Sequence, residues 1–162
     1  MESAYVELLL WLYIVNLGTC FGASVYEARI VVPQWSSSLP HSLFRWNAEH
    51  RFRPHANHHF WALIANVSLT FLTVTGLVLA WLLDGLRMDW WLASASVTLL
   101  ERVFALTFLL PISRRLDQAD RHPIEEINRE ALQWVRLNYV RAGFLLLAWL
   151  IALKALALTT YG

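Results

Sequence analysis

Three histidines at the start of the second apolar stretch have a spacing that could hold a metal ion. His55, His58 and His59 are related as i, i+3 and i+4, so a helix would place their imidazoles on a shared face. Imidazole and carboxylate groups together are common ligands of transition metals. With Glu27 or Glu101 as the carboxylate, these histidines form a candidate metal site, for which iron or copper is favoured over zinc. Histidines near a membrane interface are also often only solvated or hydrogen-bonded, and that interpretation stays open.

Ionisable residues occur inside the apolar stretches, where a charged group costs about 2.5–3.5 kcal/mol at the bilayer centre. Glu101 and Arg102 lie in the third stretch and Arg141 in the fourth. Neighbouring helical residues point about 100° apart, so we expect Glu101 and Arg102 to be poor partners for each other and to pair across helices, with Arg141 and Glu27 as the candidate partners. We predict that Glu27, Glu101 and Arg141 face the interior. Glu27 is favoured as the metal ligand and Glu101 as a member of a charge pair. A structural ion-pair network and a binding site are both consistent with this pattern.

Smaller polar residues recur at helical spacing in each apolar stretch, which would place them on one inward-facing stripe of each helix. The main members of these stripes are Asn16, Cys20, Asn66, Thr70, Thr73, Ser94, Thr98 and Asn138. The simplest interpretation is that they join the helices by hydrogen bonds, each worth about 0.6 kcal/mol on average.

The composition is that of an integral membrane protein. Of 162 residues, 57% are hydrophobic and 15% are charged, whereas soluble domains are about a quarter charged. A spanning helix needs roughly 20 mostly apolar residues. Four such stretches lie at about 8–32, 57–83, 90–111 and 134–160. The sequence therefore predicts an all-α, integral membrane four-helix bundle that forms a single domain over residues 1–162, with the lipid bilayer as a partner and no nucleic acid.

Proline and glycine mark the expected helix ends. We expect Pro33 to end the first helix, Gly85 to separate the second from the third, and Pro111 to close the third. Pro123 is followed by acidic residues, which is typical of a helix start, so the fourth helix should begin near Ile124, before it enters the bilayer. The single cysteine excludes an internal disulfide and paired-cysteine redox chemistry.

Basic residues gather in the two long loops, which sets the expected orientation. These loop residues are Arg45, Arg51 and Arg53 in the first loop and Arg114, Arg115, Arg121 and Arg129 in the second. By the positive-inside rule both loops are cytoplasmic and both termini are non-cytoplasmic.

Two motifs lie in the last third of the chain. Leu-Leu-Pro-Ile-Ser-Arg-Arg-Leu occupies 109–116, and Trp-Val-Arg-Leu-Asn-Tyr-Val-Arg occupies 134–141. With Gly18, Gly22, Tyr26 and Pro33 of the first helix, they resemble the anthrone oxygenase-like family of small four-helix membrane proteins. That family often has Asn two residues after the proline, where this chain has Ser113.

The resemblance implies oxygenation of a hydrophobic aromatic or polyketide-like substrate, such as conversion of an anthrone to an anthraquinone. Such chemistry needs a base, a group that holds the enolate oxygen, and an apolar pocket. For this chemistry His59 or Glu101 would be the base, and Arg141 with Asn138 would hold the enolate; the histidines are proposed on their own chemistry and are not carried over from the family. The pocket for substrate or cofactor would be walled by Trp61, Trp134 and Phe104. It also implies a location in the bacterial inner membrane.

Two other function classes stay open at this point. A small transporter or channel component would use the same buried charges as an ion or proton path, and would require a homo-oligomer because four helices make a thin pathway. A non-catalytic membrane scaffold would keep the charges only as pairing devices. Metal analysis of the purified protein would separate a metalloenzyme from both.

Overall fold

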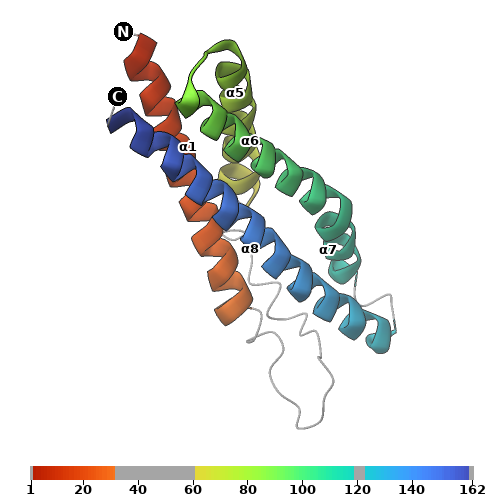
Figure 1. Cartoon of the computed structure of the whole chain (residues 1–162). Coiled ribbons are helices and arrows are strands. Elements are labelled where there is room, and N and C mark those ends of the chain that lie inside the picture. Colours follow the sequence, from red (N-terminus) through yellow and green to blue (C-terminus); the bar gives the residue numbers. More distant parts are fainter. Residues whose placement is uncertain (1, 32–60, 119–122, 161–162) are drawn as a thin grey trace.

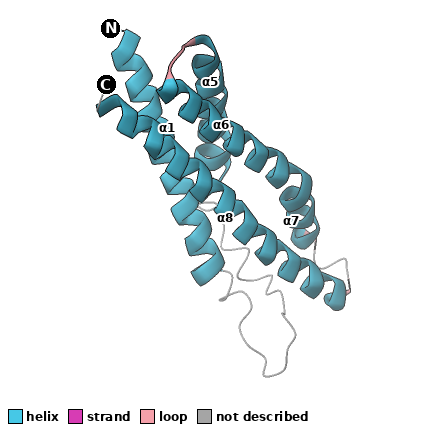
Figure 2. Cartoon of the chain, in the orientation of Figure 1, coloured by secondary structure: helices cyan, strands magenta, loops and turns pink. Residues whose placement is uncertain are grey.

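The computed structural model describes residues 2–31, 61–118 and 123–160, and almost all of this part of the chain is helical (Figure 2). The first half contains α1 (Glu2–Tyr26), η1 (Glu27–Val31), η2 (Trp61–Ser68) and α5 (Leu69–Leu82). The second half contains α6 (Leu86–Phe104), η3 (Ala105–Leu109), α7 (Leu110–Asp117) and α8 (Ile124–Thr160). The η segments are π-helical, and each continues directly into or out of an α-helix, so the described part of the chain forms four long helical rods.

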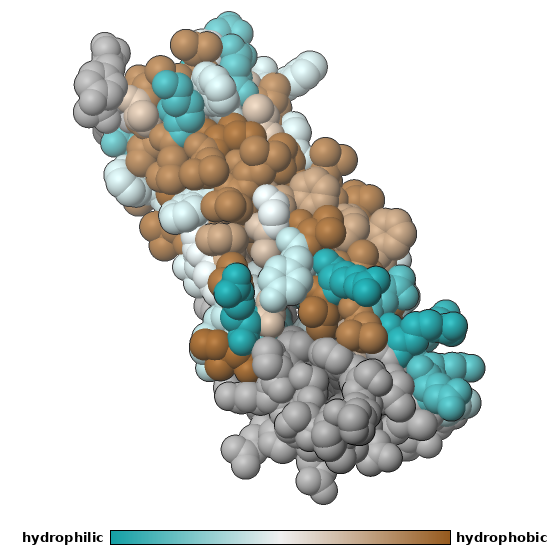
Figure 3. Space-filling view, turned by 60° about the horizontal axis from the view of Figure 1, so that its bottom comes forward, coloured by the Kyte–Doolittle hydropathy of each residue, from teal (hydrophilic) through white to brown (hydrophobic). Residues whose placement is uncertain are grey.

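The four rods pack as a bundle in which α8 contacts α1 and α6, while α5 contacts the same two helices from the other side (Figure 1). The start of α1 and the end of α8 lie at the same end of the bundle (Figure 1). Among the described residues, three helices are long and apolar enough to cross a membrane, namely Ala4–Ile30, Leu86–Leu116 and Glu125–Leu158, and Asn66–Leu82 is a shorter apolar helix. Apolar residues form a broad band across the described part of the face shown in Figure 3, with hydrophilic residues toward both ends. The predicted all-α membrane bundle is therefore confirmed.

Two of the predicted helix ends are confirmed. Gly85 has φ 122°, a conformation that L side chains rarely adopt, and α6 begins at the next residue. At the start of α8, the backbone N–H groups of Glu126 and Ile127 donate to the carbonyl of Pro123. The predicted end at Pro33 lies outside the described residues.

The prediction that Pro111 closes the third helix is wrong, because the rod runs on to Asp117 as α7. Pro111 lies at the first positions of α7, directly after the π-helical segment η3. The N–H of Leu110 donates to the carbonyl of Ala105, one residue further back than in an α-helix. A proline ring collides with the carbonyl four residues back in a regular α-helix. The wider π turn before Pro111 removes part of that conflict, and the same rod begins at Leu86 rather than near residue 90.

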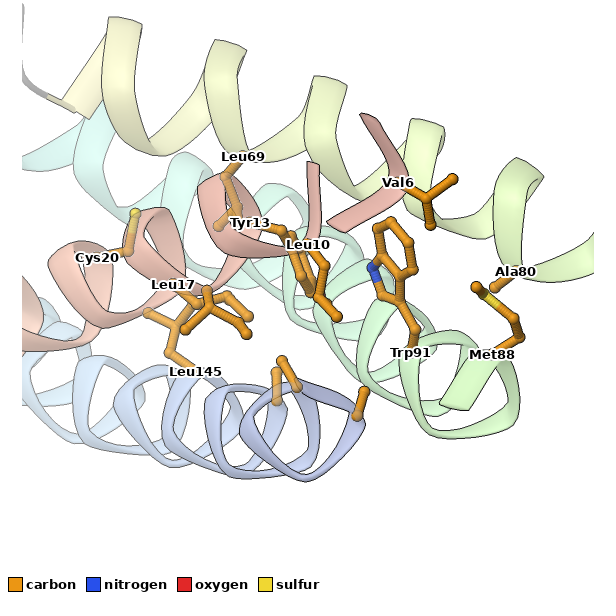
Figure 4. Packing of buried hydrophobic residues seen from close by; sticks show 14 residues of the cluster. Val6, Leu10, Tyr13, Leu17, Cys20, Leu69, Ala80, Met88, Trp91 and Leu145 are labelled. Carbon is orange, nitrogen blue, oxygen red and sulfur yellow. The ribbon is translucent and has the colours of Figure 1, made fainter. Parts of the chain in front are cut away.

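The main core lies where all four rods meet, and two tryptophans pack against glycines there. Figure 4 shows Trp91 reaching from α6 toward α5, where a methyl group on Gly76 would lie 2.7 Å from its indole nitrogen. On the other side of the bundle, a methyl group on Gly18 of α1 would lie 3.1 Å from the ring of Trp149. Small residues at these two contacts let the helix backbones approach closely.

A second, smaller core joins α7 to the first turns of α8. It contains Leu116, Ile127 and Ala131, with Ile112 and Trp134 packed against it. This cluster fixes the end of the third rod against the fourth.

Candidate functional site

The carboxylate of Glu101 is the centre of a buried charged cluster between α6 and α8. Its side chain is fully buried, and its two oxygens accept separate hydrogen bonds. Oε1 accepts from Nε of Arg141 at 2.8 Å, and Oε2 accepts from Nε of Arg102 at 2.5 Å. At 1.5 Å per residue, Glu101 lies roughly 22 Å from the start of α6 and roughly 24 Å from the end of α7. The cluster therefore lies near the middle of a membrane-length rod, and the predicted pairing of Glu101 with Arg141 across helices is confirmed.

The expectation that Glu101 and Arg102 are poor partners is wrong. Their Cβ atoms do point in different directions, but the long arginine side chain carries its guanidinium far enough round the helix to meet the neighbouring carboxylate. Nη1 of Arg102 also donates to Oδ1 of Asn66 in η2 at 3.1 Å. Arg102 thus connects the second rod to the charged cluster.

The side chains of Arg102, Glu101 and Arg141 are 9%, 0% and 11% exposed, so the cluster is shielded from its surroundings. Cys20 of α1 is also buried. Glu27 is buried as well. It lies seven residues after Cys20 on the first rod, which is roughly 10 Å along the helix axis at 1.5 Å per residue. The prediction that Glu27, Glu101 and Arg141 face the interior is confirmed.

Three hydroxyl groups form a hydrogen-bonded lock on the side of the cluster nearer the chain termini. The hydroxyl of Ser94 donates to the carbonyl of Ala148 at 2.7 Å, and that of Thr98 donates to the carbonyl of Ser94 at 3.0 Å. Because Ser94 and Thr98 use their single hydrogens in these bonds, the one hydrogen of the Tyr13 hydroxyl is shared between their oxygens, which lie 3.1 Å (Ser94) and 2.6 Å (Thr98) from it. The lock joins α1, α6 and α8, which supports the interpretation of these polar groups as links between helices.

Tyr13 was not predicted from the sequence, although a signal for it exists. It lies seven residues before Cys20, on the same stripe of α1 as the other buried polar residues. A tyrosine hydroxyl inside a spanning helix needs a partner, so this position could have been included in the stripe.

The predicted inward stripe of the second helix is only partly correct. Thr73 is buried and its hydroxyl donates to the carbonyl of Leu69 at 2.6 Å. Thr70 and Asn66 are exposed. The buried face of α5 is a narrow stripe that includes Leu69, Thr73 and Gly76, and Thr70 lies about 100° away from Leu69 on the helix. The π-helical turns of η2 also change the phase of the pattern before Leu69.

Asn138 and Trp134 lie on α8 before Arg141. Asn138 is buried, and its amide nitrogen donates to the carbonyl of Trp134 at 3.3 Å, within its own helix. The Trp134 ring packs on the smaller core beside α7. Trp61 is the first residue of η2. The predicted roles of these three residues stay predictions.

Three phenylalanine rings form a row beside the charged cluster. Phe104 and Phe144 have ring centroids 5.8 Å apart at an interplanar angle of 48°, and Phe104 and Phe108 are 5.3 Å apart at 42°. Phe104 lies three residues after Glu101 on α6, and Phe144 lies three residues after Arg141 on α8. The row therefore spans the same helix pair as the ion pair.

The predicted metal ligands His55, His58 and His59 lie outside the described residues. Within residues 2–31, 61–118 and 123–160, no group of three or more His, Cys, Asp or Glu side chains could hold a metal ion. The metal site with Glu27 therefore stays a prediction.

π-Helical turns are frequent at functional sites. One begins at Glu27, one contains Asn66, and one follows Phe104.

A family model for anthrone oxygenase matches residues 57–151, which is more than half of the chain. The matched residues include the whole charged cluster together with Asn66 and Asn138. No curated protein and no solved structure matches the chain. The match confirms the resemblance carried by the two motifs of the last third, and it points to an oxygenase-like function. The chain belongs to the anthrone oxygenase family.

Proposed function

We propose that the protein is a membrane-embedded oxygenase that acts on a hydrophobic aromatic ketone with an acidic C–H, such as an anthrone. The family match supports an oxygenase-like function. The single observation that carries the proposal is the Glu101 carboxylate buried between two guanidinium groups. This arrangement offers a proton acceptor and an anion-binding group at one point of an apolar bundle.

Removal of a proton from the methylene carbon of an anthrone places negative charge on its ketone oxygen. Arg141, with Arg102 beside it, would bind that oxygen through charge-assisted hydrogen bonds, which are stronger than neutral ones. Donors fixed in a site that excludes water stabilise developing charge far better than water does. The arginines would therefore make the carbon acid easier to ionise.

Glu101 would accept the proton. Its negative charge disappears as the enolate charge appears, so the guanidinium groups exchange one anionic partner for another. The net charge of the buried cluster stays the same throughout the step. This matters because uncompensated charge inside a bilayer is costly.

The carbanion would then donate electrons to dioxygen and form a carbon–oxygen bond. The resulting peroxide takes the proton back from Glu101. Loss of the remaining proton on that carbon, with cleavage of the oxygen–oxygen bond, releases water and leaves a second ketone. The balance is anthrone plus dioxygen giving anthraquinone plus water.

The test measures the oxygenation of anthrone by the purified protein in lipid nanodiscs. Dioxygen consumption and anthraquinone absorbance give the rate, which is compared with the rate without protein. We expect Arg141→Gln to lower kcat by about 10²–10³, the usual effect of removing an oxyanion donor. Lys154→Gln is the matched control, because Lys154 is an exposed cation on the same helix. Metal content measured on the same sample tests the histidine site independently. Absence of oxygenation by the parent protein, or a parental rate in Arg141→Gln, would overturn the proposal.

A further inference from the structure

We infer that the rings of Phe104 and Phe144 bind the aromatic substrate, and that Phe108 contacts the substrate as it enters this site from the bilayer. The inference rests on the proposed function and names the residues that position its substrate. None of the three phenylalanines belongs to the charged cluster of Glu101, Arg102 and Arg141.

The register of the two helices places the rings beside the charges. Phe104 follows Glu101 by three residues and Phe144 follows Arg141 by three, so each ring lies on the same side of its helix as the charged residue before it. The Glu101–Arg141 bond and the Phe104–Phe144 contact both join α6 to α8. A planar molecule against the rings would have its oxygen within reach of the guanidinium of Arg141.

Exposure increases along the row. Glu101 is fully buried, Phe104 and Phe144 are half-buried, and Phe108 is 50% exposed on the side of η3. The aromatic row therefore connects the buried cluster to the outer surface of the bundle. A hydrophobic substrate dissolves in the bilayer, so an apolar lateral route suits it better than a route through water.

The chemistry of the row selects the ligand. Aromatic rings prefer tilted or offset contacts at centroid distances of 4.5–7 Å, and the Phe104–Phe144 and Phe104–Phe108 pairs already have such geometry. A fused aromatic ring system can extend that arrangement, while its carbonyl oxygen meets a cation. The site thus favours flat polycyclic ketones and phenols over aliphatic chains.

The experiment measures binding and turnover separately in the full-length protein in nanodiscs. Binding of anthraquinone, which cannot be oxygenated at the same carbon, is followed by quenching of intrinsic tryptophan fluorescence. We expect Phe104→Leu and Phe144→Leu to weaken anthraquinone binding and raise KM roughly two- to tenfold, with kcat within about twofold of the parent. Phe108→Leu should raise KM at least about twofold with no change in melting temperature, because a half-exposed ring contributes little to packing.

Phe71→Leu is the matched control, since Phe71 of α5 is 65% exposed and lies on another helix than the aromatic row. It should leave Kd and KM unchanged. Folded Phe104→Leu, Phe144→Leu and Phe108→Leu variants with parental Kd and KM would overturn the inference, and if the first two fail to fold, Phe108→Leu decides alone. If anthraquinone binding depends on the phenylalanines but no oxygenation is detected, the inference stands and the proposed function is overturned. If oxygenation is detected but none of the three substitutions changes Kd or KM, the proposed function stands and the inference is overturned.

Discussion

Glu101 is the residue on which the charged cluster depends, because both arginines bind its carboxylate. Glu101→Gln removes the negative charge and leaves two buried guanidinium groups without it. Removing one partner of a buried ion pair typically costs about 3–5 kcal/mol. We expect a loss of that size in the free energy of unfolding, measured by denaturant titration in mixed micelles. Arg115→Gln is the control, since Arg115 pairs with Glu130 but is 66% exposed, and surface pairs contribute about 0–1 kcal/mol. Equal losses in the two variants would contradict the prediction.

Tyr13 should matter much less than its burial suggests. In Tyr13→Phe the hydroxyls of Ser94 and Thr98 keep the carbonyl acceptors to which they already donate. Only the hydrogen shared by the tyrosine is lost, so we expect a cost of about 0.6 kcal/mol, and at most about 1.7 kcal/mol. The free energy of unfolding and the oxygenation rate measure it. A loss above 3 kcal/mol, on the scale of a broken buried ion pair, would contradict this assignment of donors.

Some contacts of single residues could be predicted from the sequence and others could not. The pairing of Glu101 with Arg141 followed from the cost of burying either charge alone. The bond from Arg102 to Glu101 was missed, since the expectation used the direction of the Cβ atoms and not the reach of the side chain. Asn66 was identified as polar, but its contact with Arg102 needed the packing of the second rod on the third.

At the scale of elements, glycine positions decide how closely the rods approach. Gly76→Ala places a methyl group 2.7 Å from the indole nitrogen of Trp91, a ring that is only 1% exposed. Overpacking of this kind costs about 1–3 kcal/mol. Gly22→Ala on α1 meets nothing within 4 Å and is the matched control, for which we expect no loss. Thermal unfolding followed by circular dichroism compares the two. If both variants have the melting temperature of the parent protein, the Trp91 side chain can move aside and the prediction is wrong.

The number and type of helices were predictable because each apolar stretch is long and bounded by turn signals. The end at Pro111 was not, because the rule that proline stops a helix assumes α-helical geometry. A single π-helical segment just before the proline changes that geometry, and the apolar pattern contains no clear sign of it. Thr70 lies outside the inward stripe for another reason, which is that the buried face of α5 is narrow.

At the scale of the whole molecule, the orientation in the membrane is a prediction from the loop arginines. Both termini should be non-cytoplasmic, so a phosphatase fused at Gly162 should be active and a fluorescent protein fused there should be dark. Cys20 is the only cysteine of the chain and is buried. Cysteines introduced at Asp120 or near Gly162 can therefore be labelled selectively from one side. Labelling of the Asp120 variant only from outside the cell would contradict the prediction.

The hydrogen-bonded hydroxyls of Tyr13, Ser94 and Thr98 would allow protons to reach Glu101 from one end of the bundle only. All three hydrogens of Tyr13, Ser94 and Thr98 are committed, two of them to backbone carbonyls, so these groups cannot pass a proton along without breaking one of these hydrogen bonds. The lock lies on the side of Glu101 toward the chain termini. Proton exchange between Glu101 and water would then run toward the opposite end of the bundle, where α7 and the start of α8 lie. The oxygenation itself releases no net proton, so only the exchange of the Glu101 proton with water would have a side, and turnover in vesicles should leave the pH of both compartments unchanged.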